Sequence, residues 1–349
     1  MINDIHLQHF RSYKDASFEF GDGVNIIVGP NGSGKTNLME SLLVLSRGKS
    51  YRVKDVDLIE RGEDWARLEG AVLGGDRILK LIREPSSKIF EINDKKISRL
   101  TYKQVLPVVL FEPNHLMLLH GPPDGRRTYL DDILETIQPS FGSHRRNYKR
   151  LLQQRNTLLK RRYKPSTAEL FPWNLRLSEL GAAISRARTE YVQAISSDFG
   201  VLYNILASSE DGASMRYGAM FGIDTYETSM MQALEKNLTK DLDRGFTGVG
   251  PHREDFLVEI HGAPALEVAS RGETRTMVLA LKILELQSIE EATGKLPLLL
   301  LDDVFSELDG ARRRSLTKYL KRYQTFLTTT DADVVVKHFT DCTILPLGS

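Results

Sequence analysis

A glycine-rich stretch near the start of the chain has the residue types and spacing of a phosphate-binding loop. Residues 29–36 read Gly-Pro-Asn-Gly-Ser-Gly-Lys-Thr, between an apolar run at 24–28 and an apolar-periodic helix pattern. Glycines let backbone N–H groups come close to a triphosphate. Lys35 then places a positive charge against the β- and γ-phosphates, and the Thr36 hydroxyl can ligate magnesium. The residues predicted to contact the nucleotide here are Gly29, Pro30, Asn31, Gly32, Ser33, Gly34, Lys35, Thr36 and Asn37.

Two adjacent carboxylates near the other end of the chain suit the same site. Four leucines, residues 298–301, predict a buried strand that ends at Asp302 and Asp303. Beside a phosphate loop, the first carboxylate holds the magnesium shell, and the second orients or deprotonates the attacking water. Lys35 and Asp302 are 267 positions apart (302 minus 35). The two ends of the chain therefore build one site, and the middle of the chain is inserted between them.

Size and composition bound the class of protein. At 349 residues the chain exceeds the ~100 to 200 expected of one domain, so two domains or a large insertion are expected. Lys and Arg number 47 against 46 Asp and Glu, so any nucleic-acid affinity must come from local charge segregation. Cys342 is the single cysteine, which excludes an intramolecular disulfide and predicts a small buried apolar side chain. No run is long enough to span a membrane, and no signal peptide is evident, so we expect a cytoplasmic protein.

Strand patterns flank the phosphate loop. Residues 1–28 alternate apolar and polar side chains, and residues 66–97 read as an antiparallel meander with turn residues at 74–76 and 93–94. The strand at 325–329 is expected to be the last one. Arg11, one strand away from the loop, is a candidate nucleotide contact.

The middle of the chain carries a basic helical pattern. Residues 145–164 contain nine basic residues, Arg155 among them, and no acid. A second helical pattern runs from Leu177 to Ala194, and Pro165 and Pro172 lie between the two, so the pair predicts a short antiparallel hairpin with helices of ~25 residues, ~37 Å long. Such a basic stripe is typical of contact with the phosphate backbone of nucleic acids. The residues predicted to bind DNA are Arg145, Arg146, Lys149, Arg150, Lys160, Arg161 and Arg162.

Several segments together resemble the SMC-like ATPases of the ABC superfamily. Ser270 and Gly272 stand ahead of a helix, where unpaired N–H groups attract anions, and residues 269–273 take the place of that superfamily's Leu-Ser-Gly-Gly-Gln signature. Residues 306–309 resemble its D-loop. The resemblance implies an α/β fold: an ABC-type, SMC-like P-loop ATPase head with an antiparallel β meander and an inserted short α-helical arm. We expect the head at 1–112 and 245–349, and the arm at 113–244.

A closer resemblance is to the RecF family of recombination mediators. It is carried by Gly121-Pro122-Pro123-x-x-Arg126-Arg127-x-Tyr129-Leu130-Asp131, by Gly250-Pro251-His252-Arg253-x-Asp255, by residues 301–309, by residues 10–13 and by the phosphate loop. It implies an ATP-dependent homodimer, with each ATP and Mg²⁺ held between one phosphate loop and the other copy's Ser270. It also implies binding to double-stranded and gapped DNA, cooperation with RecR and RecO, loading of RecA at gaps, and association with the nucleoid when bound to DNA. Lys35 and Asp303 are then catalytic, while Thr36 and Asp302 hold the metal.

The chain departs from the family pattern at several positions. Asn114 replaces an acid, Glu273 stands where glutamine is common, Thr330 occupies the place of a switch histidine, and no Q-loop glutamine is evident between Val105 and Asn114. A carboxylate at 273 would repel a neighbour's γ-phosphate. We therefore expect slow ATP hydrolysis that times the release of DNA.

Three other functions fit parts of the pattern. A different SMC-like repair ATPase is the main alternative. A transporter's nucleotide-binding subunit would carry its signature much closer to the phosphate loop than residue 270. A small-molecule P-loop kinase would need no basic arm, and its second carboxylate strand normally follows within about a hundred residues of the loop.

Overall fold

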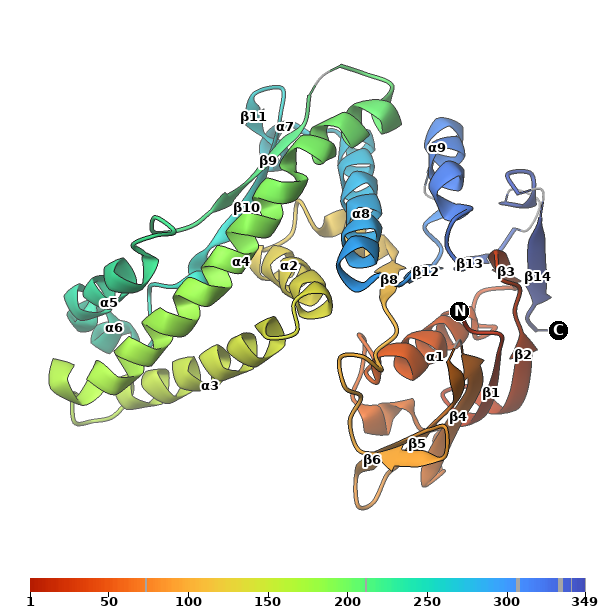
Figure 1. Ribbon diagram of the computed structural model, residues 1–349, viewed down its shortest axis with the longest axis horizontal. Coiled ribbons are helices and arrows are strands. Elements are labelled where there is room, and N and C mark those ends of the chain that lie inside the picture. The colour runs from red at the N-terminus through yellow and green to blue at the C-terminus, as the bar shows by residue number, and fades with distance from the viewer. Residues whose placement is uncertain (73, 211, 306–307, 332–334, 340, 349) are drawn as a thin grey trace. The chain divides into compact units, whose positions relative to one another are not determined.

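The computed structural model describes residues 1–72, 74–210, 212–305, 308–331, 335–339 and 341–348 (Figure 1). The chain packs as two units, one made of residues 1–116 and 285–349 and the other of residues 117–284. The first unit thus joins the two ends of the chain, and the second contains the middle. The domain boundaries expected from the sequence, 1–112 with 245–349 and 113–244, stay a prediction.

A five-stranded parallel sheet lies at the centre of the first unit. Its order is β14-β3-β13-β12-β8, and every neighbouring pair is parallel. The strands are β3 (Val24–Val28), β8 (Val108–Phe111), β12 (Leu298–Leu301), β13 (Thr325–Thr329) and β14 (Cys342–Pro346). Continuous apolar runs such as β12 form strands that are buried on both faces. The expectation that β13 is the last strand was wrong, because β14 follows it and pairs with β3 at the edge of the sheet.

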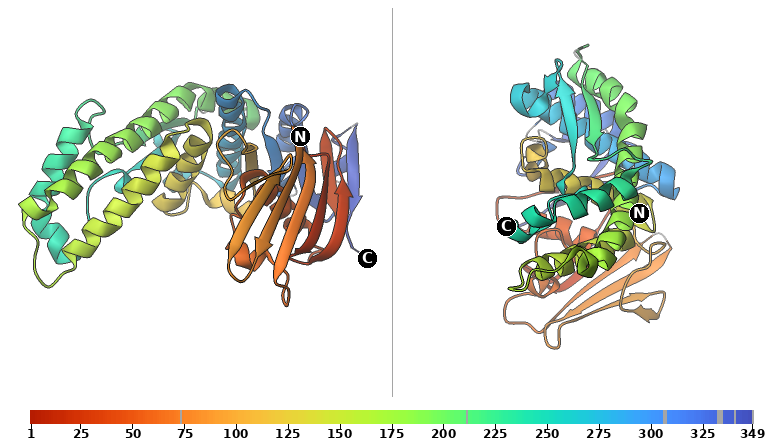
Figure 2. Two further views of the ribbon diagram at one scale, coloured as in Figure 1. Left: turned by 60° about the horizontal axis from the view of Figure 1, so that its bottom comes forward. Right: turned by 90° about the vertical axis from the view of Figure 1, so that its left-hand side faces the viewer.

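An antiparallel sheet forms the second layer of this unit (Figure 2). Its order is β2-β1-β4-β5-β6-β7. The predicted turn at 93–94 joins β6 to β7, whereas Gly75 and Asp76 of the predicted first turn belong to β5 and pair with Val72 and Ala71. Helix α1 (Lys35–Arg47) packs with both sheets in one core, which holds Leu38 and Leu42 together with Leu68 and Leu300. The other elements are β1 (Asp4–Phe10), β2 (Tyr13–Glu19), η1 (Asp55–Leu58), β4 (Trp65–Val72), β5 (Gly75–Ile82), β6 (Ser87–Ile92), β7 (Lys95–Ile97) and α9 (Gly310–Leu320).

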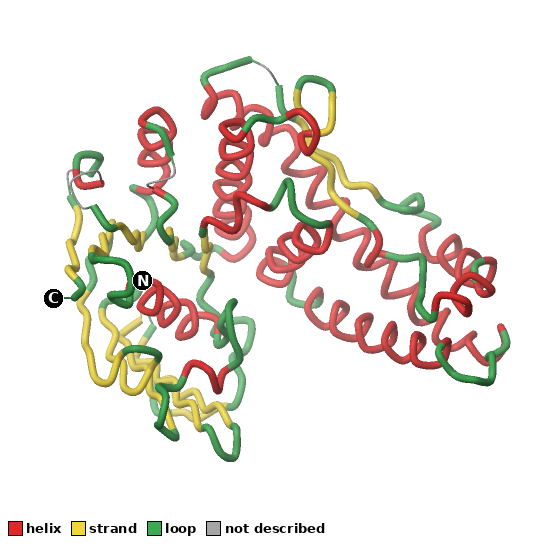
Figure 3. The backbone as a smooth tube through the Cα atoms, turned by 180° about the vertical axis from the view of Figure 1, so that it is seen from behind, coloured by secondary structure: helices red, strands yellow, loops and turns green. Residues whose placement is uncertain are grey.

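The second unit is mainly helical (Figure 3). A three-stranded antiparallel sheet, β11-β10-β9, accompanies its helices. Helix α8 (Arg271–Thr293) begins in this unit and ends in the first. The other elements are η2 (Pro113–Met117), α2 (Pro123–Ile137), α3 (Phe141–Leu159), α4 (Thr167–Ala207), β9 (Ser214–Gly218), α5 (Tyr226–Lys236), α6 (Leu238–Arg244), η3 (Pro251–Arg253), β10 (Asp255–Ile260), β11 (Ala263–Pro264) and α7 (Ala265–Val268).

The helical hairpin is present, but its second helix is longer than expected. Helices α3 and α4 pack against each other, and α4 has 41 residues, which corresponds to ~62 Å at 1.5 Å per residue. It starts with a capping box between Ser166 and Glu169. Pro172 lies inside α4, as its sixth residue, and not before it, so the helix lacks the backbone hydrogen bond that a residue at this position would donate. Within the described residues, no helix has both the length and the apolarity required to cross a membrane.

Candidate functional site

The phosphate loop connects β3 to α1, as the sequence predicts. Gly32 and Gly34 have φ of 85° and 97°, a region that favours glycine. A Cβ at Gly34 would lie 2.8 Å from the Tyr13 hydroxyl, so a side chain there would clash. The Lys35 ammonium is buried and donates to the carbonyls of Gly29 and Pro30 at 2.7 and 2.9 Å. The lysine side chain thus lies across the loop, with its ammonium on two carbonyls of the loop.

Thr36 and Asp302 meet next to this loop. Thr36 Oγ1 donates to Asp302 Oδ1 at 3.3 Å, and Thr328 Oγ1 donates to the same oxygen at 2.8 Å. The backbone N–H of Asp303 donates to Thr328 Oγ1 at 2.8 Å. The Asp303 side chain is exposed, and the backbone of this residue has a φ of 55°. Strand β13 lies between β3 and β12 and carries Thr328. Parallel strands end at one edge of a sheet, and this brings the predicted residues together.

The groups at this edge fit ATP with Mg²⁺. Hydroxyl and carboxylate oxygens, here from Thr36 and Asp302, are the ligands that Mg²⁺ prefers. Ser33 Oγ is buried and has no hydrogen-bond partner among the described residues, so an added phosphate oxygen would satisfy it. The first turn of α1 presents its unpaired N–H groups at the same place.

Three residues at this edge were missed by sequence reasoning. Thr328 holds Asp302, as described above. Glu112 follows β8, which pairs with β12 so that Phe111 is opposite Leu301. Burial, and to a smaller extent the charge of Asp302, raises the pKa of Glu112, while hydrogen bonds with Asn114 and Tyr51 lower it. The rule that residues after parallel strands share one edge would have pointed to Glu112 and Thr328; no pattern in the sequence indicates Tyr51.

The β1–β2 turn holds the start of α1. Arg11 donates from Nε and Nη2 to the two carboxylate oxygens of Glu40, at 2.8 and 3.1 Å, and Glu40 is fully buried. Asn37 donates to Ser12 Oγ at 2.9 Å. Tyr13 donates to the Gly34 carbonyl at 3.1 Å. These contacts position the loop, and nucleotide contact by Arg11 and Asn37 stays a prediction.

The predicted signature begins α8 in the second unit. Ser270 and Glu273 form a reciprocal capping box: Ser270 N–H donates to Glu273 Oε2 at 2.7 Å, and Glu273 N–H donates to Ser270 Oγ at 3.2 Å. Glu273 Oε1 accepts from His261 Nε2 at 2.9 Å. These hydrogen bonds, that of His261 first, lower the pKa of Glu273 to about 2. Gly272 lies between Ser270 and Glu273 in the sequence, in the first turn of α8. Of the predicted D-loop, Ser306 and Glu307 lie outside the described residues, and Asp309 caps α9 through the Arg312 N–H.

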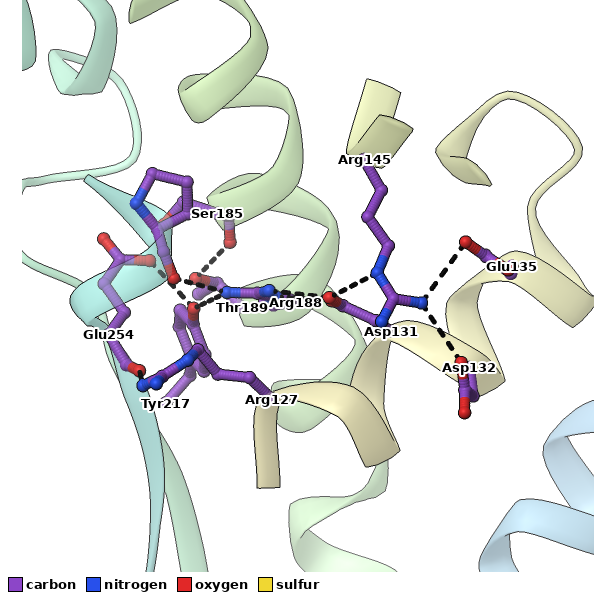
Figure 4. A network of polar contacts seen from close by, with 11 residues as sticks. Arg127, Asp131, Asp132, Glu135, Arg145, Ser185, Arg188, Thr189, Tyr217 and Glu254 are labelled. Carbon is purple, nitrogen blue, oxygen red and sulfur yellow. Dashed lines mark hydrogen bonds and ion pairs between the residues drawn. The ribbon is translucent and has the colours of Figure 1, made fainter. Parts of the chain in front are cut away.

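Most of the residues predicted to bind DNA are exposed. Arg146, Lys149 and Arg150 lie on α3, and Lys160, Arg161 and Arg162 follow its end. Arg145 is half-buried, and its guanidinium binds three carboxylates, those of Asp131 at 3.1 Å, Asp132 at 3.1 Å and Glu135 at 3.3 Å (Figure 4). The inclusion of Arg155 in the basic stripe was wrong. It is fully buried, and its Nη1 donates to Asp241 Oδ2 at 2.8 Å.

The two segments that carry the closest family resemblance meet in the second unit. Arg126, from the first segment, binds both oxygens of Asp255, from the second, with contacts of 2.6 to 3.0 Å. Arg188 of α4 joins them, since it donates to both oxygens of Asp131 and to the Pro251 carbonyl at 2.7 to 2.9 Å (Figure 4). In this structure, these motif residues fix helices α2 and α4 to the start of β10.

The comparisons with known proteins agree with this arrangement. The model of the RecF/RecN/SMC N terminal domain matches residues 1–343. The DNA replication and repair protein RecF of Listeria welshimeri is 32% identical over 346 residues, with 94% of this chain and 92% of that protein covered. Its counterpart in Clostridium kluyveri is 33% identical over 351 residues, with 97% of this chain and 95% of that protein covered. The chain belongs to the RecF family.

Solved structures support the same assignment. The "recombination mediator protein RecF-ATPrS in RecFOR pathway" is 30% identical and has a TM-score of 0.88, with 99% of this chain and 97% of that chain covered. An Smc head bound to the C-winged helix domain of ScpA has a TM-score of 0.55 at 16% identity, which shows a shared fold alone. Membership of the RecF family confirms the predicted ABC-type, SMC-like fold and sets aside the transporter and kinase alternatives.

Proposed function

We propose that this RecF-family chain is an ATP-dependent DNA-binding protein of recombinational repair. Two copies dimerise when ATP is bound, the dimer binds duplex or gapped DNA, and slow hydrolysis releases it. The observation that carries the proposal is the contact of Thr36 with Asp302 beside the Lys35 loop, because it joins the two ends of the chain in one nucleotide site. Its relatives are named DNA replication and repair proteins, and its structural neighbours bear the names RecF-ATP and RecF-ATPrS.

The proposed chemistry is attack of water on the γ-phosphorus, with ADP as the leaving group. Lys35 would move its ammonium from the Gly29 and Pro30 carbonyls to the phosphate oxygens, and Thr36 and Asp302 would hold Mg²⁺. The metal would neutralise negative charge on the phosphates. Asp303 accepts a proton from the attacking water as the bond between the γ-phosphorus and the bridging oxygen breaks. Thr328 holds both aspartates: its hydroxyl donates to the Asp302 carboxylate, and its oxygen accepts from the backbone N–H of Asp303.

Ser270 completes the site of the second copy. It lies at the start of α8, where the helix presents N–H groups and its dipole to an anion. We propose that its hydroxyl and the Gly272 N–H bind the γ-phosphate held by the other copy's loop. Each ATP then bridges two chains, and its hydrolysis separates them.

DNA would bind along the exposed arginines and lysines of α3 and its end. Phosphate contacts of this kind release counterions and carry no sequence readout. The relatives' part in the RecFOR pathway leads us to propose RecR, with RecO, as partners, and RecA loading at gaps as the result. The protein would act in the cytoplasm, at the nucleoid.

Light scattering of the wild type and Asp303→Asn tests this proposal. The variant suits the site because asparagine tolerates the positive φ of residue 303. We expect monomers without nucleotide, and a dimer that persists on duplex DNA with ATP when residue 303 is asparagine. A monomeric mass in every condition, for both proteins, would show that the ATP sandwich is wrong.

A further inference from the structure

A hairpin turn places one histidine against the signature segment. Strands β10 and β11 are joined by the two residues His261 and Gly262, which have φ of 54° and 75°. Two-residue turns with positive φ at both positions match the twist of the paired strands. The turn carries the His261 ring to α8, where Nε2 donates to Glu273 Oε1 at 2.9 Å.

Both oxygens of Glu273 are therefore occupied by groups of its own chain. Oε2 accepts from the Ser270 N–H at 2.7 Å, and Oε1 accepts from His261. The Ser270 hydroxyl accepts from the Glu273 N–H at 3.2 Å, which leaves its own proton as a donor for an incoming oxygen. The Glu273 carboxylate therefore lies against the N-terminal end of α8, and the Ser270 hydroxyl still has a proton to donate.

The charge of Glu273 matters for the proposed dimer. The carboxylate is ionised at neutral pH, as an ordinary glutamate is, and the His261 contact and the capping box lower its pKa further, to about 2. A γ-phosphate that approaches Ser270 meets this negative charge three residues away. Without a second partner, the Glu273 side chain could leave the capping box by rotation and point at the phosphate, which would weaken the sandwich by like-charge repulsion.

We propose that His261 is a positioning residue for the dimer: it holds the Glu273 carboxylate on its own helix so that the ATP of a second copy can reach Ser270. This inference rests on the proposed ATP sandwich and deepens it. It explains how a chain with a carboxylate at position 273 can bind a neighbour's γ-phosphate. The side chain of His261 is 45% exposed, so its removal leaves the core intact.

The test compares four variants in two measurements. The variants are His261→Ala, His261→Gln, Glu273→Gln and His261→Ala with Glu273→Gln, and His144→Ala of α3 is the control. Light scattering at several protein concentrations with saturating MgATP gives the dimer dissociation constant. Binding of a fluorescent ATP analogue at low protein concentration gives the affinity of the monomer.

We expect His261→Ala to raise the dimer dissociation constant about two- to fivefold, the scale of one exposed charge contact, and to leave the monomer's ATP affinity unchanged. His261→Gln keeps a donor and should behave as the wild type. The double variant should recover the dimer dissociation constant of the wild type, because a neutral amide at position 273 does not repel the phosphate. A dimer of wild-type strength in His261→Ala, or a double variant as weak as His261→Ala, overturns the inference while the proposed function stands. A wild type that stays monomeric with ATP overturns both.

Discussion

Thr36 and Asp302 are separated by 266 residues in the sequence, yet their side-chain oxygens lie 3.3 Å apart. The contact depends on β13, which lies between β3, whose following loop leads to Thr36, and β12, which ends just before Asp302. It also depends on Thr328 of β13, which donates to the same carboxylate oxygen at 2.8 Å. The proposed magnesium site therefore depends on three strands from distant parts of the chain.

The first prediction concerns Asp302→Asn. The amide keeps the size of the side chain but loses the charge that binds the metal, so we expect the Mg²⁺-dependent gain in ATP affinity to fall by about tenfold or more, or ~1.4 kcal/mol. Titration of a fluorescent ATP analogue with MgCl₂ and with EDTA measures this gain. Affinity in EDTA should match the wild type, and an unchanged magnesium effect would show that Asp302 is not a ligand.

A second prediction concerns Thr328→Val, which keeps the shape of the side chain and removes the hydroxyl. Asp302 loses a donor, and the Asp303 N–H loses its acceptor. We expect a loss of stability of ~1 to 3 kcal/mol in urea unfolding, together with a lower kcat, because Asp303 is no longer held. Thr328→Ser is the control, since it restores the hydroxyl and should recover both quantities.

Arg155 should be a stability residue and not a DNA contact. The substitution Arg155→Met removes the guanidinium that pairs with Asp241, whose side chain is buried with 1% of the residue exposed. Breaking a buried ion pair in this way costs ~3 to 5 kcal/mol, which urea unfolding would detect. The matched control, Arg146→Met, removes an exposed arginine of the same helix and should change stability by less than ~0.5 kcal/mol. Equal losses in the two variants would contradict the assignment.

Arg146, Lys149 and Arg150 should act through DNA phosphates. Replacing each by alanine should reduce the slope of log affinity against log salt by about 0.9, regardless of DNA sequence. Fluorescence anisotropy with a labelled duplex between low and moderate salt provides the slope. Lys318→Ala, an exposed lysine of α9, controls for the general loss of charge. If the three variants keep the wild-type slope, α3 is not the DNA surface.

The pH dependence of stability should contain a contribution from His252. Burial lowers its pKa from the ordinary 6.5 to about 4, and its ring accepts from Tyr148 and donates to the Thr247 carbonyl. The unfolded chain therefore binds a proton below pH 6.5 that the folded chain does not bind until about pH 4. Stability should fall by about 2 kcal/mol between pH 6.5 and 5 from this group. Urea unfolding of His252→Gln over the same range should show a fall in stability that is smaller by this amount.

Local patterns were sufficient to predict the phosphate loop, the meander and the family, since each depends on neighbouring residues. Contacts between distant segments were not predictable in the same way. Arg145 counted as an exposed charge because its partners, Asp131 and Glu135, belong to another helix. Arg155 had a signal that was missed: it follows Tyr148 by seven residues and precedes Leu159 by four, so it shares their buried helix face. Strand β14 is short and half-exposed, and only its pairing with β3 identifies it.

The strand order also has a consequence for synthesis on the ribosome. Strand β3 and its phosphate loop emerge early, whereas both of β3's neighbours, β13 and β14, belong to the final part of the polypeptide. Until residues 325–346 have been translated, the backbone groups on both edges of β3 have no neighbouring strand. Because the side chains of β3 are mostly apolar, this exposed strand favours aggregation. A growing chain therefore carries the loop before the strands that support it, and the proposed nucleotide site is complete only after residues 325–346 have been added.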